Sequence, residues 1–474
     1  MNAIVPAPEA LAGDEWRRLC DWAANVRLTD IPPAILERAA RVVADNTACA
    51  IGAGSEPALL AILRSGSSAQ TGERPGVGES TVFAPACWKT GRAEAAQLNA
   101  IRANWCQFDE GHRSVMCHAG LYTVHTALAE AEATGQSMTD VLRAVVVAYE
   151  ITCRLALAWR FGQAAPHPHA VWSAMGSCAA LAVLRALPAQ SFRQALAMAA
   201  GCARAAPFAQ MAQGDPVANA WVGWGVADGF RCADLAGDGV PTTDSAPVQV
   251  FEGLLGASYT TGVLAEGLGQ HWALAGNYHK PLACAGQAMA AVEALLSLRQ
   301  IVAATSRTPV PVSITAEVHA AALQLGNPSP ATSLGARFSI PHLLAHAWLH
   351  GTRGLQAAGD HDSAARALDN LGLDDEAVTR LRQRVRLVER QPHSPAPHDR
   401  AATVRLVFAD GHEAVQTCLS AFGGPDRPMD RAAVLQKSRA LAGGQWPAFY
   451  DWLESCGDAA ALAAAPTPGD LLTD

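Results

Sequence analysis

The sequence of 474 residues carries little charge, no clustered cysteines and no basic excess. Charged residues make up 16% of it, and a net charge of −8 offers no basic surface for nucleic acid. None of its 12 cysteines forms a C-x-x-C pair, and no cysteine or histidine spacing fits a zinc site or an iron–sulfur cluster. Cysteines scattered in this way are typical of free thiols in a reducing compartment.

Long apolar runs are also missing, so the sequence predicts no membrane-spanning helix. The first residues include Glu9, Asp14 and Glu15, without the apolar core of a signal peptide. We therefore expect a cytoplasmic protein that binds neither a membrane nor nucleic acid. Half of the residues are hydrophobic, with abundant Ala and Gly, which is typical of a helix-rich enzyme.

The chain is longer than one ordinary core requires, and its periodicity changes once along the sequence. Helical patterns dominate up to about residue 275, apart from a Ser- and Gly-rich loop at 65–78. Alternating apolar residues then predict strands, and Asp410-Gly411 predicts a hairpin. We predict an all-helical domain at 1–275, an inserted α/β domain at 276–427 and C-terminal helices at 428–474 that pack back on the first domain.

The segment at 105–120 gathers most of the residues that could carry chemistry. It holds Asp109, Glu110, His112, Arg113 and His118 in a short non-periodic stretch between two helical patterns. Loops held between rigid elements often carry function, because the elements fix their geometry. The segment alone does not exclude a solvated surface loop that contains histidines by chance.

This segment resembles the D-F-D-D … H-P-[GS] segment of the MmgE/PrpD family of dehydratases, decarboxylases and epimerases. Gln107-Phe108-Asp109-Glu110 occupies the place of the acids, and His118-Ala119-Gly120 opens the next helix. Further segments match in order and spacing over nearly the whole chain, among them His167-Pro168 and Tyr278-His279-Lys280-Pro281. The resemblance implies a mainly α protein, with a large all-helical domain plus a smaller inserted α/β domain, that works as a homodimer without metal or organic cofactor.

The family reactions implied by this resemblance share one step, proton transfer at a carbon next to a carboxylate. Histidine titrates near neutrality, so we expect His118 to be the general acid or base, assisted by Asp109. Lys280 and His167 complete the predicted catalytic set. Substrate binding is predicted for Gln107, Glu110, His112, Arg113, Trp221 and His342. A metal site built from the acids and His112 is conceivable, but the resemblance implies that no metal is used.

Several positions depart from the family pattern. Gln107 replaces the first acid, Ala218 a lysine, Trp221 and Met289 histidines, and His342 a tyrosine. These changes indicate either a different substrate or an inactive site. The retained His118, Asp109, His167 and Lys280 favour a different substrate, and the loss of a cation suggests fewer carboxylates on it.

Two classes of function are therefore carried forward. The first is a cofactor-independent lyase, either a dehydratase or a decarboxylase, that acts on a small carboxylic acid, with an isomerase or epimerase as the alternative. The second is an inactive family member that serves as a binding protein. The helical patterns at 138–159 and 170–187 are apolar around most of their circumference, which predicts a homodimer in agreement with the resemblance.

Overall fold

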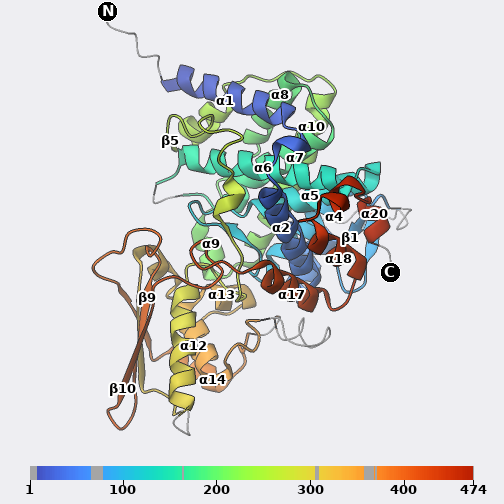
Figure 1. Ribbon diagram of the computed structural model, residues 1–474. Coiled ribbons are helices and arrows are strands. Elements are labelled where there is room, and N and C mark those ends of the chain that lie inside the picture. Colours follow the sequence, from blue (N-terminus) through green and yellow to red (C-terminus); the bar gives the residue numbers. More distant parts are fainter. Residues whose placement is uncertain are drawn as a thin grey trace, which may run out of the picture.

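The computed structural model describes residues 8–65, 78–162, 165–304, 309–356, 368 and 371–472. Helices make up most of this part, and a smaller unit with a mixed four-stranded sheet lies to one side of them (Figure 1). The loop predicted at 65–78 falls outside the described residues except at its two ends. Within these ranges, none of the helices combines the length and the apolar character needed to cross a membrane.

The helical unit begins with a series of helices whose ends follow local signals. Ser137 and Asp140 form a capping box at the start of one of them, and Gly135, with φ +69°, ends the helix before it. The helices are α1 (Pro8–Asn25), α2 (Pro33–Ile51), α3 (Pro57–Ser65), α4 (Arg92–Trp105), α5 (Ala119–Thr134), α6 (Met138–Ala158), α7 (Pro168–Leu184), α8 (Ala189–Ala200), α9 (Phe208–Gln213) and α10 (Ala220–Gly237).

Helix α7 lies at the centre of this unit. All of its residues from Pro168 to Leu184 are buried, and α5, α6, α8 and α10 pack around it. Gly225 of α10 allows the closest approach, because a Cβ there would lie 1.8 Å from Ser173 Oγ of α7. A single chain thus covers the apolar surface from which the homodimer was predicted, and the dimer now rests on the family resemblance alone.

The smaller unit is a four-stranded sheet covered by helices. Strand order is β10 (Glu413–Cys418), β9 (Ala402–Val407), β7 (Ser313–Val318) and β8 (Val385–Glu389), with β7 and β8 parallel and the other pairs antiparallel. The predicted hairpin is present, and Gly411 has the positive φ of +81° that favours glycine. The helices are α12 (Met289–Ala303), α13 (Ser333–Phe338), α14 (Ile340–His350) and α16 (Glu376–Arg382).

After the sheet, the chain returns to the helical unit through α17 (Arg431–Ala442), α18 (Pro447–Ser455), α19 (Ala459–Ala463) and α20 (Pro468–Leu471). Helices α17 and α18 pack against α2, and Figure 1 shows these red helices beside the blue helix α2. One hydrophobic core joins them to the first helices, and a second core holds the sheet with α12 and α14. Ala170, Met211 and Trp221 of the helical unit belong to the second core, so the two units meet there.

Candidate active site

The acid-rich segment is fixed at the junction of the two units by a short pair of strands. Helix α4 ends at Trp105, and Gln107 turns the chain with φ +54°. Strand β3 (Gly111–His112) then pairs antiparallel with β6 (Asn277–Tyr278). This pairing brings the acids next to Lys280, two residues after the end of β6, although the two segments lie far apart in the sequence.

His118 and Asp109 form the central pair of the site. His118 Nδ1 lies 2.6 Å from Asp109 Oδ2 and 2.8 Å from the backbone oxygen of Glu110. A carbonyl oxygen can only accept, so Nδ1 carries the proton and donates it to both oxygens. His118 Nε2 has no hydrogen-bond partner among the described residues. It is therefore the ring nitrogen that is available to a substrate.

Lys280 sits behind the same carboxylate. Its Nζ lies 3.6 Å from Asp109 Oδ1 and donates to the backbone oxygen of Gln107 at 3.0 Å, while only 1% of the residue is exposed. Burial alone would lower the pKa of Lys280, but Asp109 and the weaker effects of neighbouring groups such as Tyr278 together outweigh it, and the pKa is raised. Burial likewise disfavours the charged Asp109, yet Lys280 and His118 lower its pKa. The pair is therefore charged at neutral pH.

His167 and His169 form a second, uncharged corner at the start of α7. Burial, and then His118, lowers the pKa of His167 to about 3. Its Nδ1 accepts from the backbone N–H of His169 at 3.2 Å, so Nε2 carries the proton of the neutral ring. His169 uses both nitrogens, since Nε2 donates to Asn104 Oδ1 at 3.1 Å and Nδ1 accepts from the hydroxyl of Tyr122 at 2.9 Å. His167 can thus donate one hydrogen bond, whereas His169 is held in place.

A cavity opens where these groups meet. Its lining includes five of the residues predicted from the sequence, namely Gln107, His112, His118, His167 and Lys280. Asp109 lies behind it, fully buried. His112 contributes a neutral ring, because its Nδ1 accepts from the Ser114 N–H and burial lowers its pKa to about 4. Among the histidines that line this cavity, His118 is therefore the candidate for acid/base chemistry.

The other predicted residues do not line this cavity. Glu110 points inward, where its carboxyl accepts from the Gly120 N–H at 2.9 Å and the Tyr149 hydroxyl at 2.8 Å. Trp221 packs its ring 5.6 Å from that of His167. His342 lies inside the smaller unit, where Nε2 donates to the Leu371 oxygen at 2.7 Å. The structure thus places Glu110 and Trp221 in the packing around the site, and His342 in the interior of the smaller unit.

The structure also places residues in the cavity that the sequence did not single out. Tyr278 is the last residue of β6, two residues before Lys280, and Arg400 comes from the loop before β9. His169, two residues after the predicted His167, also lines the cavity. Tyr278 opens the family-like segment that contains Lys280, so its place near the site could have been predicted. Arg400 follows a Pro-rich loop and belongs to no motif.

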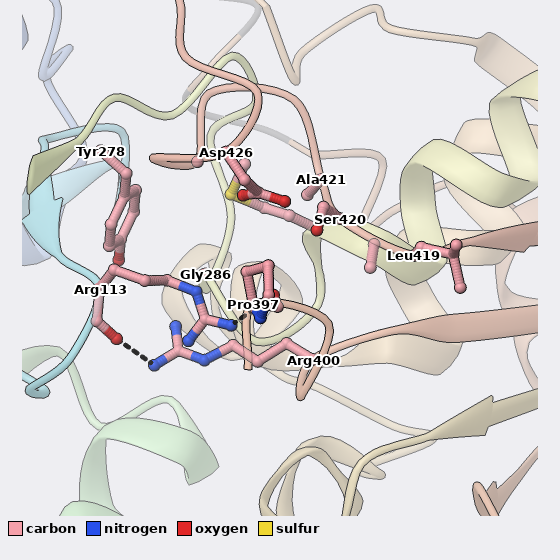
Figure 2. A pocket seen from close by; sticks show the side chains of 12 residues that line it. Arg113, Tyr278, Gly286, Pro397, Arg400, Leu419, Ser420, Ala421 and Asp426 are labelled. Carbon is pink, nitrogen blue, oxygen red and sulfur yellow. Dashed lines mark hydrogen bonds between the residues drawn. The ribbon is translucent and has the colours of Figure 1, made fainter. Parts of the chain in front are cut away.

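A second cavity adjoins the first, and Arg400, Tyr278 and Gly286 belong to both linings. Figure 2 shows this second cavity, with the predicted Arg113 beside Arg400. Arg113 forms an ion pair with Asp399, and its backbone oxygen accepts from Arg400 at 3.2 Å. In the part of the chain that the structure describes, no group of three His, Cys, Asp or Glu side chains could hold a metal ion.

Comparison with known proteins finds matches to both units. The model of the MmgE/PrpD N-terminal domain matches residues 17–266, and that of the MmgE/PrpD C-terminal domain matches residues 282–448. A cis-aconitate decarboxylase of Aspergillus terreus strain NIH 2624 / FGSC A1156 is 24% identical over 469 residues, which covers 90% of this chain and 88% of the relative. Another Aspergillus terreus sequence of that name is 24% identical over 464 residues, with the same coverage.

Proposed function

The chain belongs to the MmgE/PrpD family, and we propose that it is a lyase that transfers a proton next to a carboxylate of a small carboxylic acid without a cofactor. The observation that carries this proposal is the His118–Asp109 pair. Asp109 and the Glu110 oxygen hold the Nδ1 proton, and Nε2 is left as a base at a cavity that also contains Lys280. A carboxylate that orients a histidine in this way fixes its tautomer for acid/base work.

The proposed step begins when His118 Nε2 removes the proton from the carbon next to the substrate carboxylate. The electron pair moves into the carboxylate and forms an enediolate, which Lys280 and the Nε2–H of His167 stabilise as its charge develops. In a dehydratase the pair then returns and expels a β-hydroxyl, which takes the proton from His118 and leaves as water. A decarboxylase needs no removal of a carbon proton: His118 starts as the imidazolium, the bond to CO₂ breaks and leaves its electron pair on the carbon, and His118 donates its Nε2 proton to this carbanion and regains one from solvent.

An isomerase of the same family remains the alternative, together with an inactive family member that only binds its ligand. The isomerase differs in one point, because the enediolate regains the proton on the opposite face and no group leaves. The binding protein would hold carboxylic acids without exchanging any proton. The three functions therefore predict different products from the same experiment.

That experiment incubates the protein in D₂O with a panel of small carboxylic acids and follows deuterium and products by NMR. We expect deuterium next to a carboxylate together with loss of water or CO₂, unchanged by EDTA, and a fall in kcat of about 100-fold or more for His118→Ala. His350→Ala is the matched control, because His350 Nε2 also pairs with a carboxylate, Asp375 Oδ2 at 2.8 Å, but lies outside the cavity. Full activity of His118→Ala would end the proposal.

The substrate is expected to differ from those of the better-known family reactions. Ala218 occupies the position of the family's lysine. Its side chain is an uncharged methyl group and is completely buried, so it cannot bind a carboxylate. We therefore expect little or no turnover of 2-methylcitrate or cis-aconitate. Rapid turnover of either acid would show that the missing lysine is not needed for a third carboxylate.

A further inference from the structure

We propose that Arg400 binds a second carboxylate of the substrate at the wall between the two cavities, which makes the protein selective for dicarboxylic acids. This inference rests on the proposed function, since it concerns the substrate of the same site. Arg400 lines the cavity of His118 and Lys280 as well as the neighbouring one in Figure 2. A single ligand that reaches from one cavity into the other must pass its guanidinium group.

The charges around Arg400 favour an anion there. Asp399 is already paired with Arg113, and among the described residues no carboxylate forms an ion pair with Arg400. Among the described residues, the Arg400 guanidinium donates one hydrogen bond, to the Arg113 backbone oxygen. Most of its five N–H donors are therefore free. Burial, followed by the charge of Arg113, lowers the pKa of Arg400. Arginine nevertheless stays protonated, and a carboxylate would balance it.

Of the described side chains, Lys280 and Arg400 are then the two cations available to a substrate, and a tricarboxylate would need a third. Lys280 belongs to the reacting end, beside Asp109 and His118, and Arg400 belongs to the part of the lining that is shared with the second cavity. The second cavity also contains Arg113, whose charge is already balanced by Asp399. Its other walls include the apolar Met289, Leu419 and Ala421, while Asp426 adds negative charge. Apart from Arg400, the described lining of this cavity offers a third carboxylate no unpaired cation, and its apolar walls suit an apolar or hydroxylated end. The chemical class that fits both cavities is a dicarboxylic acid.

A purely structural role for Arg400 makes a different prediction. Its bond to the Arg113 oxygen could simply tie the loop before β9 to the acid-rich segment. Removing such a tie would disturb the cavity for every ligand to the same extent. Removing a carboxylate-binding group would instead weaken only the ligands that carry the second carboxylate. Selectivity between matched acids therefore separates the two roles.

The test measures binding by calorimetry for pairs of acids with the same chain length, succinate with butyrate and glutarate with pentanoate. We expect the unmodified protein to bind one of the dicarboxylates about tenfold or more tightly than its partner, the effect of one charge-assisted hydrogen-bonded pair. Arg400→Ala should abolish that difference and leave the monocarboxylate within about twofold, while Arg400→Lys keeps part of it. The control is Arg405→Ala, an exposed residue of β9 that pairs with Glu413.

Three outcomes of the comparison between paired acids would overturn the inference. They are a protein that does not distinguish the paired acids, an Arg400→Ala variant that keeps the selectivity, and one that loses affinity for both acids equally. Inorganic phosphate that binds as tightly as the dicarboxylates, with the same dependence on Arg400, would show a general anion site and also overturn it. The D₂O experiment decides the proposed function separately, because exchange that depends on His118 can persist when the Arg400 selectivity is absent, and the reverse.

Discussion

Lys437 and Asp45 form a buried ion pair that joins the last part of the chain to the first, with Lys437 Nζ 2.6 Å from Asp45 Oδ1. Lys437 lies on α17 and Asp45 on α2. The same ammonium group donates to the backbone oxygen of Phe108 at 2.6 Å, directly before Asp109. Asp45 Oδ2 in turn lies 2.7 Å from Nδ1 of His279, directly before Lys280. One ion pair therefore positions both segments that meet in the candidate active site.

Lys437→Met is expected to destabilise the protein by about 3 kcal/mol or more, because it leaves the buried Asp45 without its cation. The free energy of unfolding, measured by denaturant titration, should recover in part when Asp45→Asn is added. Arg439→Met on the same helix is the control. Its pairs with Asp451 and Glu454 lie at the surface, so the loss should stay below about 1 kcal/mol. Equal losses for the two variants would contradict a structural role for the buried pair.

Lys280→Met is expected to lower kcat as well as raise KM. Lys280 balances Asp109 at 3.6 Å, so its removal disturbs the carboxylate that orients His118 in addition to any grip on the substrate. We expect kcat/KM to fall about 100-fold or more. Lys89→Met is the control, because Lys89 is an exposed lysine that also pairs with a carboxylate, that of Glu132, outside the cavity. A rise in KM at unchanged kcat would limit Lys280 to substrate binding.

The order of elements could be predicted from the sequence because it depends on short-range signals. Apolar periodicity, the Ser137 cap and the Asp410-Gly411 turn act within a few residues, and the structure has the corresponding helices and hairpin. The position of His118 at the start of α5 follows from the same local pattern. The family motifs added the pairing of this segment with Lys280, which no periodicity could supply.

The composition of the cavity surface was harder to predict, because it depends on which way each side chain points. Asp109 and Glu110 are neighbours in the sequence, yet one faces His118 and the other the buried Tyr149. His342 matches a family motif, but it faces Leu371 within the smaller unit. Arg400 reaches the site from a loop of that unit, and nothing in its local sequence indicates the contact.

Glu110 predicts how stability depends on pH. Burial raises its pKa to about 8, from about 4.3 in an unfolded chain, so between these values the folded protein holds a proton that the unfolded chain has released. Stability from this group is therefore complete below about pH 4 and is lost as the pH rises to about 8. Glutamine imitates the protonated acid and does not titrate.

We therefore expect Glu110→Gln to resemble the unmodified protein near pH 5 and to become the more stable of the two near pH 9. Thermal unfolding midpoints at both pH values provide the measurement. Glu132→Gln serves as the comparison, since its carboxylate accepts from Thr81 and pairs with the exposed Lys89. Parallel pH profiles for Glu110→Gln and the unmodified protein would show that Glu110 is ionised throughout.

His167 is expected to act as a neutral hydrogen-bond donor and not as a second acid or base. With a pKa of about 3, it stays uncharged over the working range of most enzymes, and its Nδ1 is already an acceptor. The Nε2–H can therefore stabilise charge that develops on a substrate oxygen, a contribution of about 100-fold in kcat for one well-placed donor. His167→Asn should lose about that much while the pH–rate profile keeps its shape. If a limb of the profile instead disappears in the variant, His167 exchanges a proton itself, and the single-base mechanism assigned to His118 is wrong.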